Sequence, residues 1–269
     1  MQDLSVGRIP ETPEYLFEQI RISFPRWCTA FSNFKESSGH SSISTEQLGL
    51  KLINIHRLHL TIYYEYAKAT ELAFYKNETS FFSWDDYSDL FGEIVSLADD
   101  VIKTTHGDQT PSSRYSSTYP EVGKHKSAVQ PLFCLDNGVL VPLYEVATLC
   151  RDPAIRRRAA RILRIAPRQE GVYNSQLLAM AAEKAIEIEE AAALRGSLAY
   201  DSIAGEFKTE HEQHTIEKSS QIPDSVRLTY AFPKIDMVKG SISLTIAPSA
   251  TKEIRIPWPA LDFLVDHSI

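Results

Sequence analysis

Residues 150–164 read CRDPAIRRRAARILR and carry six arginines against a single aspartate. Asp152 and Pro153 predict the start of a helix, because an aspartate side chain accepts hydrogen bonds from free backbone amides and proline is tolerated at the first helical position. Pro167 is expected to end that helix. Apolar residues recur along one face at steps of three and four: Ile155, Ala159, Ile162, Leu163 and Ala166. The stretch therefore predicts an amphipathic helix whose apolar face packs on a core.

The arginines on the opposite face are Arg157, Arg161 and Arg164. They are compatible with nucleic-acid binding, with phosphate binding, and with a structural use as solvated or paired side chains. A phosphate site at a helix start usually adds a glycine-rich turn, and this start lacks one. We favour the structural use, with partners in an acidic stripe of the following helix: Glu183, Glu187 and Glu190.

Charge elsewhere in the chain argues against a DNA-binding surface. Seven arginines and one aspartate give residues 151–168 a net charge of +6, which leaves −13 for the rest of a chain whose net charge is −7. A field of that sign repels phosphates, so any DNA contact has to be local. With 269 residues, of which 43% are hydrophobic and 23% charged, the chain can bury a sizeable core.

The cysteines Cys28, Cys134 and Cys150 are far apart and form no C-x-x-C pair. Neither a disulfide framework nor a cysteine zinc site is predicted from them, and a reducing intracellular compartment fits best. The sequence also lacks an apolar run near the roughly 18 residues that a membrane span needs. We therefore expect a soluble chain without a membrane partner.

Four segments have helical patterns. A helix is expected over 46–76, where one face comprises Leu48, Leu52, Ile55, His59, Ile62, Tyr66 and Ala69. A second should follow Asp85–Asp86 as caps and stop near Thr104. GVLVPLYEVATLC at 138–150 predicts a buried helix with Pro142 in its first turn. After the arginine helix, Asn174 or Ser175 should open a further helix and Gly196 should close it. Its expected inner stripe is Leu178, Ala181, Ala182, Ala185, Ile188 and Ala192.

The period changes near residue 225. SVRLTYAF, SISLTIA and EIRIPW alternate apolar and polar residues between turn-forming segments, which predicts two or three antiparallel strands. The fold class is therefore mainly α, a helical bundle or irregular helical array with a small antiparallel β element at the C-terminus. We expect a partly flexible segment at 1–45, a helical domain at 46–195, a linker at 196–224 and a β element at 225–269 packed on the helical domain.

Two histidine pairs have spacings that suit a shared metal on a helix, namely His56 with His59 and His211 with His214. Neither pair has an evident third ligand, and the second is not an H-E-x-x-H motif because its histidines are three residues apart. We expect the first pair to pack within a helix and the second to lie in a solvated loop. No metal site and no cofactor are predicted.

Catalytic motifs are missing as well, since the sequence has no G-x-S-x-G, G-x-x-x-x-G-K-[ST] or G-x-G-x-x-G pattern. Asp85 and Asp86 are interpreted as helix caps rather than catalytic acids. The aromatic residues Phe81, Phe82 and Trp84 are expected to pack on the core ahead of that helix, with an exposed partner-binding patch as the alternative. No catalytic residue is predicted, and we expect the chain not to be an enzyme.

Three stretches in this order, SWDDYSDLFGEIVSLADDVI, PLFCLDNGVLVPLYEVATLCRDPAIRRRAARILR and PRQEGVYNSQLLAMAAEKAIEIEE, resemble the carboxy-terminal regulatory region of fungal binuclear zinc-cluster (Zn2Cys6) transcription factors. The resemblance runs from about residue 48 to 195, and the strand-rich tail through Trp258 resembles the family's usual ending. The residues that carry it are Asp136, Gly138, Pro142, Cys150, Arg151, Asp152, Pro153, Arg156, Arg157, Glu170, Gly171, Ser175, Ile188, Glu189 and Glu190.

The resemblance implies an all-helical regulatory domain in a nuclear regulator of transcription. Its implied partners are proteins of the transcription apparatus or a zinc-cluster relative, with a small-molecule effector in a helical cleft. The family reads DNA with a six-cysteine zinc cluster, whereas this chain has three scattered cysteines, so we expect no direct tight DNA binding by this chain. The alternative is a helical enzyme or metabolite-binding protein that shares the scaffold.

Overall fold

A computed structural model describes residues 13–38, 44–76, 82–106, 132–134, 138–204, 215–228, 230–236, 241–247 and 252–256. Its α-helices are α1 (Pro13–Ser38), α2 (Ser44–Lys76), α3 (Ser88–His106), α4 (Leu140–Leu149), α5 (Pro153–Ile165) and α6 (Ser175–Ala204). The prediction of a mainly α fold is confirmed. None of the described helices is both long and apolar enough to cross a membrane.

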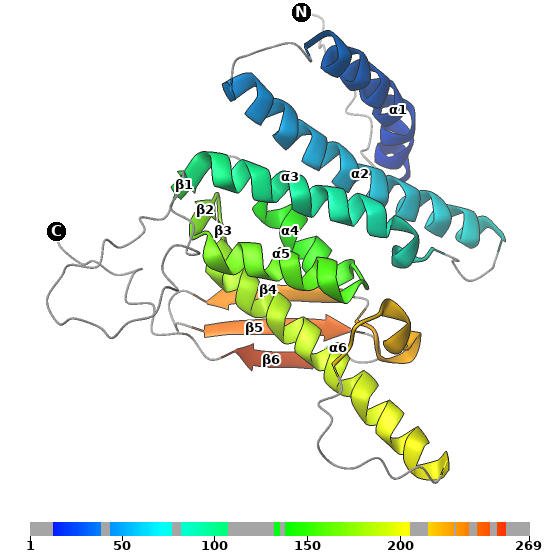
Figure 1. Cartoon of the computed structure of the whole chain (residues 1–269). Helices are drawn as coiled ribbons and strands as arrows, with labels where there is room; N and C mark the ends of the chain where they lie inside the picture. Colours follow the sequence, from blue (N-terminus) through cyan, green and yellow to red (C-terminus); the bar gives the residue numbers. More distant parts are fainter. Residues whose placement is uncertain are drawn as a thin grey trace, which may run out of the picture.

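The helices stack in order across the molecule. Helix α1 packs on α2, α2 packs on α3, and α3 contacts both α4 and α5. Figure 1 shows α1 and α2 on one side, α4 and α5 in the middle, and the C-terminal strands on the opposite side, with α6 crossing the strands and extending beyond them. The predicted helix at 46–76 is α2, and Ile55, Leu58 and Ile62 are its buried residues toward the core.

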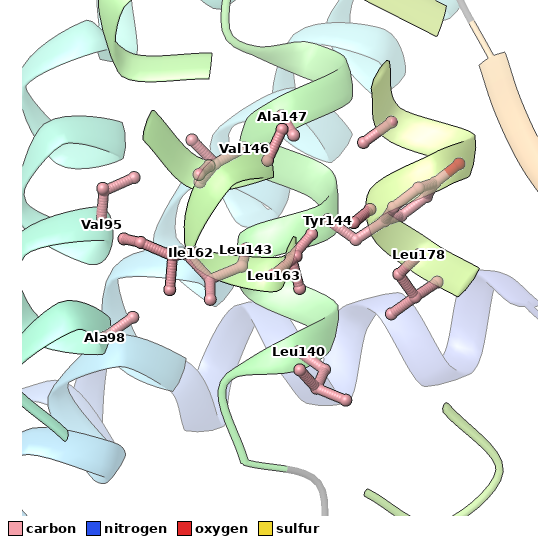
Figure 2. Packing of buried hydrophobic residues seen from close by; sticks show 14 of the residues in the cluster. Val95, Ala98, Leu140, Leu143, Tyr144, Val146, Ala147, Ile162, Leu163 and Leu178 are labelled. Atoms are coloured by element: carbon pink, nitrogen blue, oxygen red, sulfur yellow. The ribbon is translucent and has the colours of Figure 1, made fainter. Parts of the chain in front are cut away.

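The core lies where α4 meets its neighbours. Helix α4 is buried on most sides, with Pro142 in its first turn as expected. Figure 2 shows Leu143 of α4 and Ile162 of α5 close together in the core, with Val95 of α3 nearby. The apolar face predicted for the arginine helix is confirmed, because four of its five residues are buried and the fifth, Ile155, is partly buried against them.

Two small sheets complete the fold. In the first, β1 (Leu132–Cys134) pairs in parallel with β2 (Arg168–Glu170), which pairs antiparallel with β3 (Tyr173–Asn174). The second is the predicted antiparallel element, in the order β4 (Tyr230–Asp236), β5 (Ser241–Ala247), β6 (Lys252–Ile256). Strand β5 contributes Ile242, Leu244 and Ile246 to the helical core. Strand β4 begins at Tyr230 rather than near residue 225, where the alternating pattern starts. A short 3-10 helix, η4 (Asp224–Val226), precedes the strand.

The expected helix caps at Asp85 and Asp86 are wrong. Both residues lie inside a 3-10 turn, η1 (Trp84–Tyr87), which is capped by the Ser83 hydroxyl, and α3 begins at Ser88. The Asp85 carboxylate instead lies 3.5 Å from the guanidinium groups of Arg151 and Arg227. Asp85 therefore forms long-range ion pairs rather than a local helix cap, and these pairs join η1 to the segments next to α5 and η4.

Gly196 does not close α6, which continues to Ala204. A glycine inside a helix costs only about 1 kcal/mol relative to alanine, so it does not have to end one. The segment expected as a linker at 196–224 thus begins inside α6, contains the 3-10 helix η3 (Ser219–Gln221), and ends at the first residue of η4. The segment at 1–45, expected to be partly flexible, contains α1.

Candidate functional site

The amino end of α4 is capped by a carboxylate from another element. Glu170 on β2 is fully buried, and its oxygens accept hydrogen bonds from the backbone amides of Gly138, Val139 and Leu140 at 2.9–3.1 Å. Negative charge is favourable there because it meets the unpaired amides and the positive end of the helix dipole. The contact is close: a Cβ on Gly138 would lie 2.5 Å from Glu170 Oε1. Glu170 therefore holds α4 against β2.

The turn after Glu170 and the start of α6 are tied to α5. Gly171 has φ 53°, a left-handed conformation that glycine adopts without strain. Asn174 caps α6 by accepting hydrogen bonds from the amides of Gln176 and Leu177. Ser175 donates to the carbonyl of Ala166. The predicted start at Asn174 or Ser175 is confirmed.

A buried ion pair joins α5 to α6. Arg156 Nη1 lies 2.6 Å from Glu189 Oε2, and the two side chains are 1% and 6% exposed. Arg156 Nε donates to the carbonyl of Ala147 on α4, and Glu189 Oε1 accepts from the amide of Leu228. One pair thus connects three helices to the segment that leads into β4. One signal in the sequence could have indicated that Arg156 is buried. It lies three, four and seven residues before Ala159, Ala160 and Leu163, a spacing that places it on the same buried face of α5.

Three other arginines of α5 have acidic partners, whereas the exposed Arg161 forms no ion pair with a described residue. Arg157 pairs with Glu190 at 2.8 Å, and Arg164 pairs with Glu183, as the acidic stripe of α6 predicted. Further pairs are formed by Arg158 with Asp99 at 2.9 Å and by Arg151 with Asp224 at 2.7 Å. Glu187 pairs with Lys184 instead. Burial alone would raise the pKa of Asp99. Hydrogen bonds from Arg158 and Lys103 outweigh this effect, so the pKa of Asp99 lies below its ordinary value.

A cavity of about 860 Å³ lies between α2, η1, α4, the β2–β3 turn, α6 and β4. This volume is in the range that accommodates a drug-sized ligand. Its lining residues are Tyr63, Tyr66, Trp84, Val141, Tyr144, Glu145, Thr148, Leu149, Gln169, Val172, Tyr173, Asn174, Leu177, Leu178, Ala231, Phe232 and Pro233. Thirteen of these side chains are aromatic or aliphatic, so the cavity is an apolar space with few polar groups.

The charged group of the wall is Glu145 on α4. Its Oε2 contacts Nε2 of His59, and Tyr63 also forms a hydrogen bond to this carboxylate. Burial first, and then the charge of Glu145, raise the pKa of Tyr63 well above its ordinary value, so the hydroxyl stays protonated and donates. The His59 ring packs edge-on against Tyr63. His59 therefore positions a carboxylate at the cavity, a role that its place on the predicted helix face did not indicate.

Four other polar side chains of the wall, those of Tyr144, Thr148, Gln169 and Asn174, form hydrogen bonds within the protein. The Tyr144 hydroxyl donates to the carbonyl of Ala231 at 2.8 Å. Thr148 Oγ1 donates to carbonyls of its own helix, and the amide groups of Gln169 and Asn174 bond to each other. These bonds fix the shape of the wall.

Aromatic rings ahead of α3 form part of the same wall. Trp84 stacks on Tyr66 with ring centroids 5.4 Å apart, and Phe82 meets both rings edge-on. Phe82 and Trp84 therefore pack on the core side, as expected, while Phe81 lies outside the described residues.

Metal and nucleophile chemistry have little support in the described part of the chain. No cluster of three or more histidine, cysteine or acidic residues suits a metal among the residues described. His211 and His214 lie outside them. Burial raises the pKa of the Cys150 thiol to about 12, so this cysteine stays protonated at neutral pH.

Comparison of the chain with protein-family models, with curated proteins and with solved structures found no match. The apolar cavity with the Glu145 carboxylate is therefore the candidate site on the strength of its geometry. Sequence reasoning missed it because its wall is assembled from six separate segments, and each contributes a few residues that look like ordinary core.

Proposed function

We propose that this chain is a regulator of transcription of the fungal zinc-cluster type, acting through a helical domain that binds protein partners and a small effector. The observation that carries the proposal is the position of the residues on which the resemblance rests. They hold together α4, α5 and α6, and two of these helices supply much of the cavity wall.

Several of these residues have a clear structural role in the described part of the chain. Asp152 accepts hydrogen bonds from the amides of Ala154 and Ile155, which starts α5. Arg156 and Glu189 form the buried pair, and Glu170 caps α4. Asp136 lies outside the described residues. The motif thus builds a scaffold around a ligand-sized space, as an effector-responsive regulatory domain requires.

Four of the five arginines of α5 support a role other than DNA binding. Arg156 is buried, and Arg157, Arg158 and Arg164 are paired with carboxylates. A helix that reads the major groove has to present its side chains to base edges and phosphates. We therefore propose that partners in the nucleus, rather than this helix, bring the chain to DNA.

Fusion of the full chain to a heterologous DNA-binding domain tests the proposal. The fusion is expected to change transcription from a reporter that carries the matching sites in a fungal host, and the unfused chain should accumulate in the nucleus. A fusion with Leu163→Asp, which places a charge in the core, is the control and should lose the effect. A folded fusion that reaches the nucleus and leaves the reporter unchanged would contradict the regulatory function.

The alternative, a helical enzyme or metabolite-binding protein on the same scaffold, is favoured by one observation. The His59–Glu145 pair lies beside the cavity, and paired histidine and carboxylate groups serve in acid–base catalysis. However, His59 is not among the described residues that line the cavity. Turnover of a cavity-bound compound that is lost in His59→Gln would establish this alternative.

A further inference from the structure

Aromatic side chains form much of the cavity wall. They are Tyr63, Tyr66, Trp84, Tyr144, Tyr173 and Phe232, and they come from α2, η1, α4, β3 and β4. Tyr63 also meets Trp84 edge-on at 6.2 Å between centroids, so the rings of α2 and η1 form a continuous surface. The faces of aromatic rings carry partial negative charge and attract cations, most strongly when water is excluded.

Glu145 is the charged group that the described wall offers to a ligand. The Tyr144 hydroxyl already donates a hydrogen bond to the Ala231 carbonyl. The Asn174 side-chain oxygen already accepts hydrogen bonds from the backbone amides that begin α6. Glu145 differs, because a carboxylate has about four acceptor positions and its contacts with His59 and Tyr63 leave capacity for further donors. Its side chain is 25% exposed.

The charges of the described wall favour a cationic ligand. Among the described residues that line the cavity, none is lysine, arginine or histidine. A carboxylate or phosphate ligand would therefore lie beside the Glu145 charge with no positive side chain of the described wall to compensate it. An ammonium group would gain both the carboxylate and the aromatic faces.

We propose that the cavity binds an apolar organic cation, with a protonated amine directed at Glu145 and a ring system packed on the aromatic wall. This inference rests on the proposed effector role of the cavity and specifies the chemical class of the effector. An occupant of this kind contacts α2, α4 and β4 together.

Three probes that share one ring system and differ in charge test the sign. They are 1-pyrenylmethylammonium, 1-pyrenylmethanol and 1-pyrenecarboxylate, each titrated with the full chain at pH 7 and followed by the anisotropy of pyrene fluorescence. The ammonium probe is expected to bind about tenfold or more tightly than the carboxylate probe, with the alcohol between them.

Two variants locate the effect. Glu145→Gln keeps the shape of the side chain and should remove the preference for the ammonium probe, whereas Glu187→Gln removes the same charge from an exposed residue outside the cavity and should leave the preference intact. Ala231→Phe fills the cavity from β4 and should weaken binding of all three probes. Circular dichroism checks that each variant is folded.

The outcomes separate the two proposals. Equal binding of the three probes, or tighter binding of the carboxylate, would overturn the cation inference and leave an effector cavity in place. If no probe binds, or if Ala231→Phe leaves binding unchanged, the cavity is not the effector site and this inference falls with that part of the proposed function. Should Glu145→Gln fail to fold, the ranking of the three probes on the unchanged protein still decides the sign.

Discussion

Replacing Arg156 with methionine removes the cationic half of the buried ion pair and keeps an unbranched side chain in its place. Glu189 is then left buried, at 6% exposure, with the Leu228 amide as its remaining donor in the described structure. Because a buried carboxylate without its counter-charge is unfavourable, the variant should lose about 3–5 kcal/mol of the free energy of unfolding. Glu189→Gln should cost a similar amount, since it leaves the Arg156 guanidinium uncompensated.

The double variant Arg156→Met with Glu189→Gln should recover most of this loss. A glutamine oxygen can still accept a hydrogen bond from the Leu228 amide. Methionine also avoids the desolvation cost of burying the Arg156 guanidinium, which the native pair carries. That cost is visible at Arg156 Nη2, which is buried and has no hydrogen-bond partner among the described residues. We expect the double variant to lie within about 1–2 kcal/mol of the native protein.

The neighbouring residue provides a matched control. Arg157 pairs with Glu190, but its side chain is 40% exposed, so Arg157→Met should cost only about 0–1 kcal/mol. Urea unfolding followed by the circular dichroism of the helices measures all four variants, with an unchanged dependence on urea as the check of a common unfolded state. If Arg156→Met costs no more than Arg157→Met, or if the double variant costs the sum of the singles, the buried pair does not stabilise the fold as argued.

Four further outcomes are expected. Leu163→Ala should cost about 2–5 kcal/mol, because this side chain is fully buried between α4 and α5, and a cost below about 1 kcal/mol in the same titration would be inconsistent with that core. Gly138→Ala should lower the thermal midpoint, at a cost of about 1–3 kcal/mol, by pushing Glu170 off the α4 amides; an unchanged midpoint would refute the cap. The chain should bind duplex DNA no more tightly than about 10⁻⁴ M in an anisotropy titration at physiological salt, and tight binding that Arg157→Gln abolishes would reverse this view. Elemental analysis should find no stoichiometric zinc, and one metal per chain would overturn that expectation.

Elements with local signals could be predicted from the sequence. Asp152, Pro153 and Pro167 bracket α5, and the chemistry that starts and stops this helix involves residues a few positions apart. Four of the six residues expected in the inner stripe of α6 are buried, namely Leu178, Ala181, Ala182 and Ala185, whereas Ile188 and Ala192 are only partly buried. Gly196 failed as a stop signal, since a single glycine opposes a helix only weakly.

The candidate site depended on contacts that no local pattern encodes. Arg156 and Arg157 are adjacent and chemically identical, yet one is buried and the other half exposed, and only the packing of α6 and α4 distinguishes them. Glu145 and His59 are 86 residues apart in sequence and meet because α2 crosses near α4. Surfaces formed by separate segments become visible only after the helices are placed.

The cap that Glu170 provides also constrains how the protein folds. Helix α4 has ten residues, fewer than the roughly 12–15 that an isolated helix needs to persist in water, and Val139 at its N-cap position has no acceptor in its side chain. The amides at its start are satisfied by a residue about 30 positions later in the chain. We therefore expect stable formation of α4 to require closure of the chain segment between residues 140 and 170, which brings β2 to the amino end of the helix. Such a dependence on a distant residue predicts that this core forms in a cooperative, non-local step, whose rate depends more on chain closure than on helix propensity.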